Sequence, residues 1–167
     1  VPSFEENKMI GQKEMDEMLE NSRVNHAFEK RLAGYGAENS ECICDLLVKA
    51  ENLDALLMAV RLSKLTDIPF AVMGSGFSIP VTDSRCRGML VKLSGEFCQW
   101  KHLNNQRLIV GAGLALSKLI AKFQESGFSK DLISEEALGT VGSWFHHLLK
   151  VGDSRFFRFV RKVAFLD

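Results

Sequence analysis

The sequence predicts an α+β protein with a small N-terminal βαβ lobe and a second lobe of mixed, largely antiparallel character. Between residues 41 and 93, short apolar runs of strand length flank a segment whose apolar residues recur at helical spacing. Two neighbouring asparagines separate short strand-like segments further along the chain. Glycines stand at many of the boundaries between these segments, where they commonly end strands and helices.

Composition narrows the function before any motif is considered. The 167 residues suffice for one domain or two small lobes, and 46% hydrophobic with 25% charged residues is typical of a soluble globular protein. Lys+Arg and Asp+Glu both total 21, which argues against a general nucleic-acid binder because such proteins need a basic surface. No apolar run has the length of a membrane span and no secretory signal is visible, so we expect a cytoplasmic protein without membrane contact.

The residues that commonly bind metals or form disulfides are sparse. The chain has four cysteines and no CxxC pair: Cys42, Cys44, Cys86 and Cys98. Cys42 and Cys44 lie two apart in an apolar run, so a strand would point both to one face. We expect buried thiols rather than a disulfide framework or a zinc site. His146 and His147 are adjacent and diverge on a helix, so no metal site is expected there.

Residues 1–40 are predicted to form an N-terminal extension of helical and irregular structure. Gln12–Glu20 carries Met15 and Met18 on one side, which is typical of a short amphipathic helix. Asn25–Ala33 is predicted to form a second helix, and glycines follow directly after it.

Residues 41–93 are predicted to form the βαβ lobe. Cys42–Val48 is an apolar run of strand length, and Asn52 is suited to cap the helix that follows it. Ile68–Met73 is the next predicted strand, and a strand–helix–strand unit of this length should be parallel with a right-handed crossover. Gly88–Leu93 is predicted to be a further strand.

Residues 94–167 are predicted to form the second lobe. Phe97–Trp100 is expected to pair with the preceding strand, and an asparagine turn leads into a strand at Arg107–Val110. Leu116–Gln124 has apolar residues on one face and is predicted to be a helix. Phe157–Leu166 alternates apolar and polar residues and is expected to be a closing strand.

The segment most informative about chemistry follows the strand Ile68–Met73 and reads Gly74-Ser75-Gly76-Phe77-Ser78. Glycine adopts positive φ without a Cβ clash, and successive N–H groups in such a turn converge into a concave anion site. The serine hydroxyls add donors, and a diphosphate fits such a cradle. The alternative is an ordinary glycine turn after a buried strand, because GxG alone is a weak motif. Neither a Rossmann fingerprint nor a P-loop is present.

The same segment resembles the flavin-binding loop of UDP-N-acetylenolpyruvoylglucosamine reductases, where an apolar strand enters a glycine-rich turn. Further motifs of that family follow in the same order, and several motifs in order are more specific than any one. They are Val81, Asp83, Arg87-Gly88, Val110-Gly111-Ala112-Gly113, Leu116-Ser117-Lys118-Leu119 and Leu138-Gly139-Thr140-Val141-Gly142.

The resemblance implies a FAD-binding fold of the PCMH type. It also implies part of a reductase of peptidoglycan precursor synthesis that moves hydride from NADPH, through flavin, to an enolpyruvyl UDP-sugar. The residues implied at the FAD pyrophosphate are Gly74, Ser75, Gly76, Phe77 and Ser78. Those implied along the flavin ring, mainly through their backbone, are Gly139, Thr140, Val141 and Gly142.

The sequence departs from the family pattern in ways that affect this assignment. Phe77 and Ser78 replace a serine and an asparagine, which removes polar groups beside the phosphates. Glu135 and Glu136 bring two carboxylates close to the expected cofactor, where they are either solvated or repel the diphosphate. Trp144 stands in a region where the family has small residues, and it either packs in a core or stacks on a flavin.

No catalytic residue can be assigned, because the family's tyrosine-arginine motif and its substrate-binding domain would lie beyond Asp167. Two hypotheses follow. The chain is a FAD-binding domain that is incomplete as a catalyst on its own. Alternatively, it is a degenerate binding or structural module that has kept the fold and lost reductase activity, with or without flavin. A weaker third idea is that a partner chain supplies the substrate domain.

Overall fold

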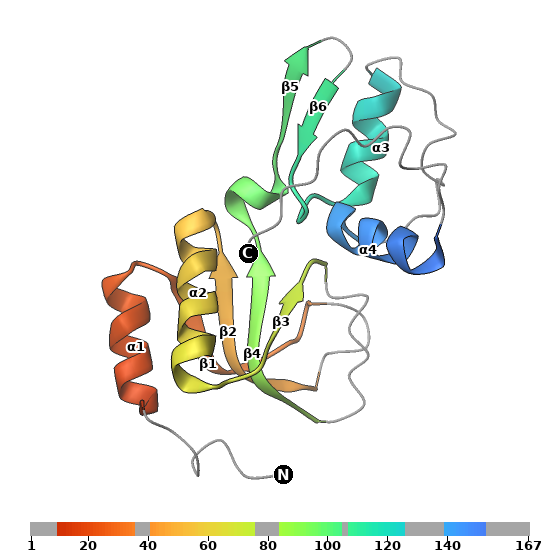
Figure 1. Ribbon diagram of the computed structural model, residues 1–167. Helices are drawn as coiled ribbons and strands as arrows, with labels where there is room; N and C mark the ends of the chain where they lie inside the picture. The colour runs from red at the N-terminus through yellow and green to blue at the C-terminus, as the bar shows by residue number, and fades with distance from the viewer. Residues whose placement is uncertain (1–9, 36–40, 76–83, 105–106, 126–138, 153–167) are drawn as a thin grey trace.

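The computed structural model of the chain contains a four-stranded sheet, a two-stranded sheet and four α-helices among the residues that it describes (Figure 1). The described residues are 10–35, 41–75, 84–104, 107–125 and 139–152. In this part of the chain, no helix is both long and apolar enough to cross a membrane.

The larger sheet is of mixed direction, and its strands are β1 (Asn25–Arg31), β2 (Ile43–Ala50), β4 (Arg85–Leu93) and β3 (Phe70–Met73), in that spatial order. β1 pairs antiparallel with β2, while β2 and β3 each pair in parallel with β4. The two strands of the predicted βαβ unit are therefore parallel, as expected. They are not neighbours, because β4 lies between them.

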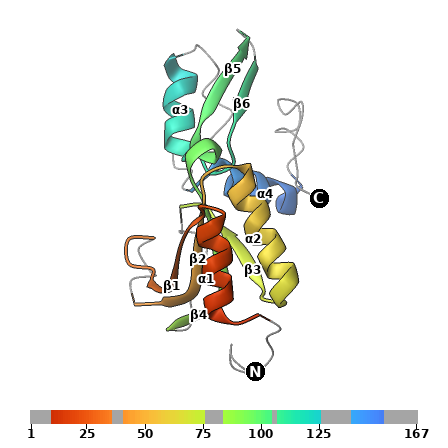
Figure 2. The same ribbon diagram turned by 90° about the vertical axis from the view of Figure 1, so that its left-hand side faces the viewer.

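Two helices cover one face of this sheet, α1 (Gln12–Asn21) and α2 (Leu53–Thr66) (Figure 1 and Figure 2). α2 begins as predicted, because the Asn52 side chain accepts a hydrogen bond of 2.9 Å from the Ala55 amide. It ends at Asp67, which adopts the left-handed conformation with φ 53°. The first helix confirms the prediction for Gln12–Glu20 within one residue at its C-terminal end.

The helix predicted for Asn25–Ala33 is wrong, because most of this segment forms the edge strand β1. Its hydrogen-bonding partner is β2, so a long-range pairing outweighs the local helical pattern. The segment before residue 40 thus contributes to the first sheet. The division of the chain at residues 40 and 93 remains a prediction.

Apolar cores lie on both faces of the four-stranded sheet. The larger core fills the space beneath α1 and α2 and includes Met15, Leu19, Leu46, Val48, Leu62, Met89 and Val91. The smaller core lies on the opposite face and consists of Leu32, Cys42, Cys44, Leu47, Met73 and Leu90. Cys42 and Cys44 are both in the smaller core, which confirms that they share a face.

The second part of the chain comprises a short 3₁₀ helix, a two-stranded sheet and two helices. These are η1 (Gly95–Cys98), β5 (Trp100–Asn104), β6 (Arg107–Val110), α3 (Leu116–Glu125) and α4 (Val141–Val151). The strand at Arg107–Val110 and the helix starting at Leu116 confirm their predictions. α3 and α4 lie on one side of the β5–β6 pair (Figure 1).

The predicted pairing of Phe97–Trp100 with the preceding strand is wrong, since β5 pairs with β6 instead. Gly95 explains the change of direction. Its φ is 52°, and a Cβ there would overlap the backbone of Glu51, with the Glu51 Cα at 2.9 Å. Only glycine fits this close approach in a left-handed conformation, so the chain leaves the first sheet at this point.

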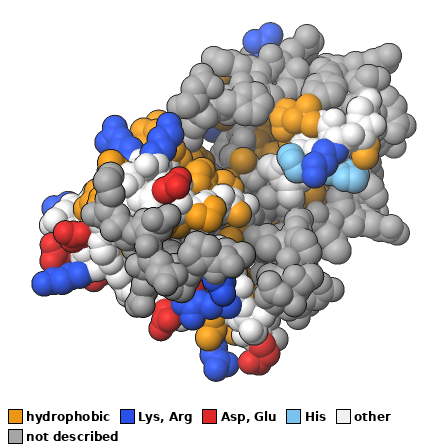
Figure 3. Space-filling view, turned by 60° about the horizontal axis from the view of Figure 1, so that its bottom comes forward, with side chains coloured by type: hydrophobic (Ala, Val, Ile, Leu, Met, Phe, Trp, Pro, Cys, Tyr) orange, Lys and Arg blue, Asp and Glu red, His pale blue; other side chains and the backbone are white. Residues whose placement is uncertain are grey.

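Some large apolar side chains remain at the surface of the described regions. Phe70 and Val72 on the edge strand β3 are 40% and 51% exposed, and Leu103 and Ile109 on the smaller sheet are 57% and 55% exposed. Figure 3 shows apolar side chains at the surface of one face. The predicted closing strand at Phe157–Leu166 also lies outside them.

Candidate functional site

The two glycine turns that the sequence predicts to bind a cofactor lie against each other. Gly74 and Ser75 directly follow β3, and Gly139 and Thr140 directly precede α4. A Cβ on Gly74 would overlap the Thr140 side chain, with Cγ2 at 2.7 Å. The Ser75 hydroxyl oxygen lies 3.9 Å from the Cβ position of Gly139. Gly76, Phe77 and Ser78 of the same predicted site lie outside the described residues.

The reason for glycine differs between the two turns. Gly139 has φ 103°, a conformation that disfavours other residues. Gly74 is not among the residues with positive φ, so the turn does not use the backbone freedom of glycine at this position. Gly74 is required instead by the close approach of Thr140, which leaves no room for a side chain.

Thr140 caps the N-terminus of α4 through a capping box with Ser143. The Ser143 amide donates to Thr140 Oγ1 at 3.4 Å, and the Thr140 amide donates to Ser143 Oγ at 2.9 Å. Thr140 is also buried, with 4% of its surface exposed. The segment Gly139 to Gly142, implied to lie along the flavin ring, is therefore the start of a helix, and Gly142 belongs to the first turn of α4.

The amides at the start of α4 are engaged within the protein. The Val141 amide donates to the Leu114 carbonyl at 2.9 Å, and the Gly142 amide donates to the Ala112 carbonyl at 2.8 Å. The Thr140 amide is also engaged, because it donates to Ser143. The predicted backbone donors Thr140, Val141 and Gly142 therefore all have partners. A ligand at this turn would meet side chains and the partial positive charge of the helix end, not these N–H groups.

Lys92 on β4 is a site residue that the sequence prediction missed. Its Nζ donates a 3.0 Å hydrogen bond to the Gly74 carbonyl, and it lies 5.1 Å from the centre of the Tyr35 ring. Burial, together with the like charge of Lys49, lowers the pKa of Lys92, although Cys98 acts in the opposite direction. The sequence gives no local signal for it, because Lys92 reaches the site only through the parallel pairing of β3 with β4, which places it opposite Met73.

The aromatic residue at the start of α4 packs in the small core of the second part. Trp144 contacts the cluster formed by the buried Leu114, Leu116 and Leu119, which agrees with the core interpretation. The neighbouring His146 and His147 are exposed. Across the described ranges, no group of three His, Cys, Asp or Glu residues could hold a metal ion.

The thiols are poor candidates for nucleophiles. All four cysteines are free, and burial raises the pKa of Cys44 to about 12 and also raises that of Cys86. A thiol must ionise to react, so these two cysteines are held in the unreactive form at neutral pH. Among the described residues, the polar side chains at the candidate site are those of Ser75, Thr140, Ser143 and Lys92.

Comparison with known proteins gives a consistent set of relatives, although no family model matches the sequence. UDP-N-acetylenolpyruvoylglucosamine reductase of Alkaliphilus oremlandii is 30% identical over 98 residues, which are 59% of this chain and 32% of that protein. The enzyme of the same name from Anoxybacillus flavithermus is 26% identical over 122 residues, covering 73% and 40% of the two chains.

Solved structures show the same relationship at the level of the fold. The reductase MurB of Thermus caldophilus superposes with a TM-score of 0.54 at 23% identity, covering 72% of this chain and 40% of that one. BBE-like 1 of Physcomitrella patens superposes with a TM-score of 0.51 at 20% identity, covering 66% and 26%.

The matches cover only part of the relatives. The chain spans 32% to 40% of the length of the two curated reductases, so their whole activity does not transfer with the similarity. The similarity is nevertheless found both in the sequence and in the arrangement of strands and helices. Together these findings show that much of the chain is similar to part of the UDP-N-acetylenolpyruvoylglucosamine reductases, and that its fold is the α+β fold of the FAD-binding PCMH type.

Proposed function

We propose that the chain is a FAD-binding domain in which the turn after β3 and the turn before α4 hold the cofactor together. The observation that carries this proposal is the contact between Gly74 and Thr140. Two segments that are far apart in the sequence, each resembling a flavin-contacting motif, meet at one place in the fold. The proposed pyrophosphate residues remain Gly74 to Ser78, and the proposed ring-side residues remain Gly139 to Gly142.

The groups at this place suit a diphosphate. The Ser75 hydroxyl is a hydrogen-bond donor, and the Lys92 ammonium group donates to the carbonyl of the preceding residue, Gly74. Charged donors bind phosphate oxygens more strongly than neutral ones, so Lys92 supports anion binding at the turn. When bound, flavin supplies hydride transfer, and the residues of this chain bind and orient it.

The reaction proposed for the complete system is the NADPH-dependent reduction of an enolpyruvyl UDP-sugar in peptidoglycan precursor synthesis. We propose that this chain does not catalyse the reaction by itself, because it spans about a third of the length of the curated relatives it matches. The substrate-binding part belongs either to the same polypeptide or to a partner chain. No catalytic residue is assigned to this chain.

A second candidate function is a binding or structural module without reductase activity. The engaged amides of Val141 and Gly142 favour it, because the ring-side turn then offers fewer free donors than the sequence implies. The packing of Trp144 in the small core also favours it, since that side chain is not held ready to stack on a ring.

FAD titration of the full chain separates the two candidates. We expect saturable binding, seen as a change in flavin absorbance and fluorescence, in the wild-type protein. Lys92→Gln should weaken FAD binding about tenfold, because a hydrogen bond involving a charged group contributes on this scale. Lys64→Gln on the exposed face of α2 is the matched control and should bind FAD as the wild type does.

If the chain takes up no FAD at concentrations up to about 1 mM, only very weak binding could have escaped detection. That result rejects the flavin proposal and favours the second candidate. If FAD binds, oxidation of NADPH in the presence of an enolpyruvyl UDP-sugar is the next measurement. No NADPH oxidation by the FAD-loaded chain is the result expected of a domain that needs a further part.

A further inference from the structure

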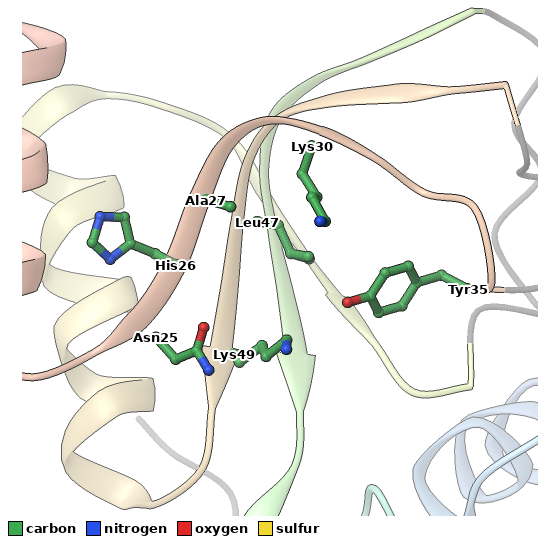
Figure 4. Close-up of a pocket in the computed structure, with 7 residues that line it drawn as sticks. All are labelled: Asn25, His26, Ala27, Lys30, Tyr35, Leu47 and Lys49. Carbon is green, nitrogen blue, oxygen red and sulfur yellow. The ribbon is translucent and has the colours of Figure 1, made fainter.

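The face of the four-stranded sheet opposite α1 and α2 carries a cavity, and none of the residues that line it belongs to the proposed flavin site. It has a volume of ≈ 140 Å³, enough for several water molecules or one phosphate-sized ion. Its lining comes from β1, β2 and Tyr35, and consists of Asn25, His26, Ala27, Lys30, Tyr35, Leu47 and Lys49 (Figure 4).

Two irregularities of the strands bring these side chains to one face. Glu29 adopts the left-handed conformation with φ 47°, and the β2–β4 register shifts between Cys44 and Leu46. Lys30 pairs with Cys44, and in a regular strand Cys44 and Leu47 would point to opposite faces. The irregularities place Cys44 and Leu47 on the same face, so Lys30 shares that face with Leu47. A left-handed glutamate is locally unfavourable by about 1 kcal/mol, so this arrangement is maintained by the surrounding sheet.

The side chains converge on a common space. The amine of Lys30 and the hydroxyl of Tyr35 point toward the space above Leu47, and the amine of Lys49 lies beside it (Figure 4). The His26 ring instead points to the other side of β1, where Nε2 lies 2.7 Å from Asp16 Oδ1. Apart from His26, the polar lining of the cavity therefore consists of two cationic groups, the Tyr35 phenol and the Asn25 amide.

Among the described residues, those that line the cavity include no carboxylate. The nearby acids on the same strands are engaged elsewhere: Asp45 accepts from Arg85 at 2.6 Å, and Glu29 pairs with Arg85 at 3.2 Å. In the described part of the chain, neither Lys30 nor Lys49 forms an ion pair. Two like charges without a counter-ion repel each other, and an anion between them relieves that repulsion.

A third cation extends the positive charge toward the glycine turns. Lys92 is the register neighbour of Lys49 on β4, and its Nζ lies 5.1 Å from the Tyr35 ring centre. The charge of Lys49 contributes to the lowered pKa of Lys92, after the larger effect of burial. The face of the sheet opposite α1 and α2 thus carries a row of lysines that extends from the cavity to Gly74.

We propose that this cavity is a binding site for a phosphate-class oxyanion, held by Lys30, Lys49 and the Tyr35 hydroxyl. The oxyanion is either a free phosphate or the phosphate of a nucleotide, since both present the same oxygens to the two amines. The site is separate from the glycine turns, and it does not depend on whether FAD binds there.

Titration of ¹⁵N-labelled full-length protein with inorganic phosphate tests the proposal. We expect saturable amide shifts at Ala27, Lys30 and Leu47. The double variant Lys30→Gln/Lys49→Gln should weaken phosphate binding about tenfold for each lysine removed, because hydrogen bonds to charged groups contribute on this scale. Lys64→Gln/Lys101→Gln removes the same charge from exposed positions elsewhere and should leave the affinity unchanged.

A second titration with adenosine monophosphate distinguishes the two sources. Tighter binding than phosphate at the same amides identifies a nucleotide, and equal binding identifies the phosphate group alone. Shifts confined to Gly74 and Ser75 overturn the proposal, because the anion would then occupy the glycine turn. Shifts without saturation, or equal affinity in the wild type and the Lys30→Gln/Lys49→Gln variant, overturn it as well.

Discussion

The sheet with α1 and α2 and the part containing β5, β6, α3 and α4 differ in how they are stabilised. The first buries apolar side chains on both faces of a four-stranded sheet, and its larger core extends from Met15 to Val91. Among the described residues, the small core of the second part has three buried members, Leu114, Leu116 and Leu119. Its other contributors, such as Trp100 and Trp144, are only partly buried.

Several glycines of the second part make close backbone contacts. A Cβ on Gly111 would lie 3.0 Å from the Cα of Phe97, and one on Gly113 would lie 2.9 Å from the Cβ of Leu93. The Gly111 contact lies within the second part, whereas the contacts of Gly113 with Leu93 and of Gly74 with Thr140 form a seam between the second part and the first. The candidate site thus lies where the well-packed sheet meets the less buried part.

The largest expected effect comes from the core of the first part. Leu46→Ala should reduce the free energy of unfolding by about 2–5 kcal/mol, because it leaves a cavity in a fully buried cluster. Leu119→Ala should cost about 2 kcal/mol, at the low end of that range, because partly exposed neighbours can relax around it. Chemical denaturation measures both, and an equal loss would contradict the difference between the two parts.

The next effect concerns the buried carboxylate of the first part. Asp45 is 3% exposed and accepts from Arg85 Nε at 2.6 Å and from the Gly88 amide at 3.0 Å. Asp45→Ala should cost about 2–3 kcal/mol, because the Gly88 amide is then buried without a partner. Glu29→Gln removes the exposed partner of Arg85 and should change the midpoint of thermal unfolding little. A similar midpoint for both variants would show that burial at Asp45 is unimportant.

The seam between the two parts is tested by a double-mutant cycle. Gly74→Ala should cost about 1–2 kcal/mol through overpacking against Thr140. Thr140→Ala should cost about 1 kcal/mol through loss of the α4 cap. The double variant should be more stable than the sum of the two costs, because removing the Thr140 hydroxyl and methyl makes room at Gly74. Additive costs in urea denaturation would mean that the two turns do not touch.

The smallest effect at neutral pH is expected at Cys44, and it grows in alkaline solution. The folded-state pKa is raised to about 12 from the ordinary value of 9.0, so the neutral thiol stabilises the fold fully below pH 9. That contribution is lost as the pH rises from 9.0 to about 12. The wild type should therefore lose more stability across this window than Cys44→Ala, and parallel pH profiles for the two proteins would refute the raised pKa.

Features set by neighbouring residues could be predicted from the sequence. Asn52 caps α2 because its side chain needs only the amide three residues later. α3 follows from apolar residues at helical spacing, and the parallel direction of β2 and β3 follows from the connection between them. The glycine turns were also recognisable, because glycine marks such positions in the sequence itself.

Features set by distant residues could not be predicted in the same way. β1 was predicted as a helix because its partner β2 is chosen in the tertiary fold. The role of Gly74 depends on Thr140, and the hydrogen bond that brings Lys92 into the site depends on the pairing of β3 with β4. None of these contacts leaves a mark in the local pattern of the residues involved.

By itself, the sequence determined most of the described segments that are helical or extended, the position of the glycine turns and the relationship to flavin-binding reductases. Only the tertiary structure decided that the two turns touch, that the amides of Val141 and Gly142 are already used, and that lysines gather on one face of the sheet. The physical reason is the distance along the chain over which each effect acts. Backbone preference and side-chain periodicity act over a few residues, whereas free donors and clustered charges depend on which distant strands pair.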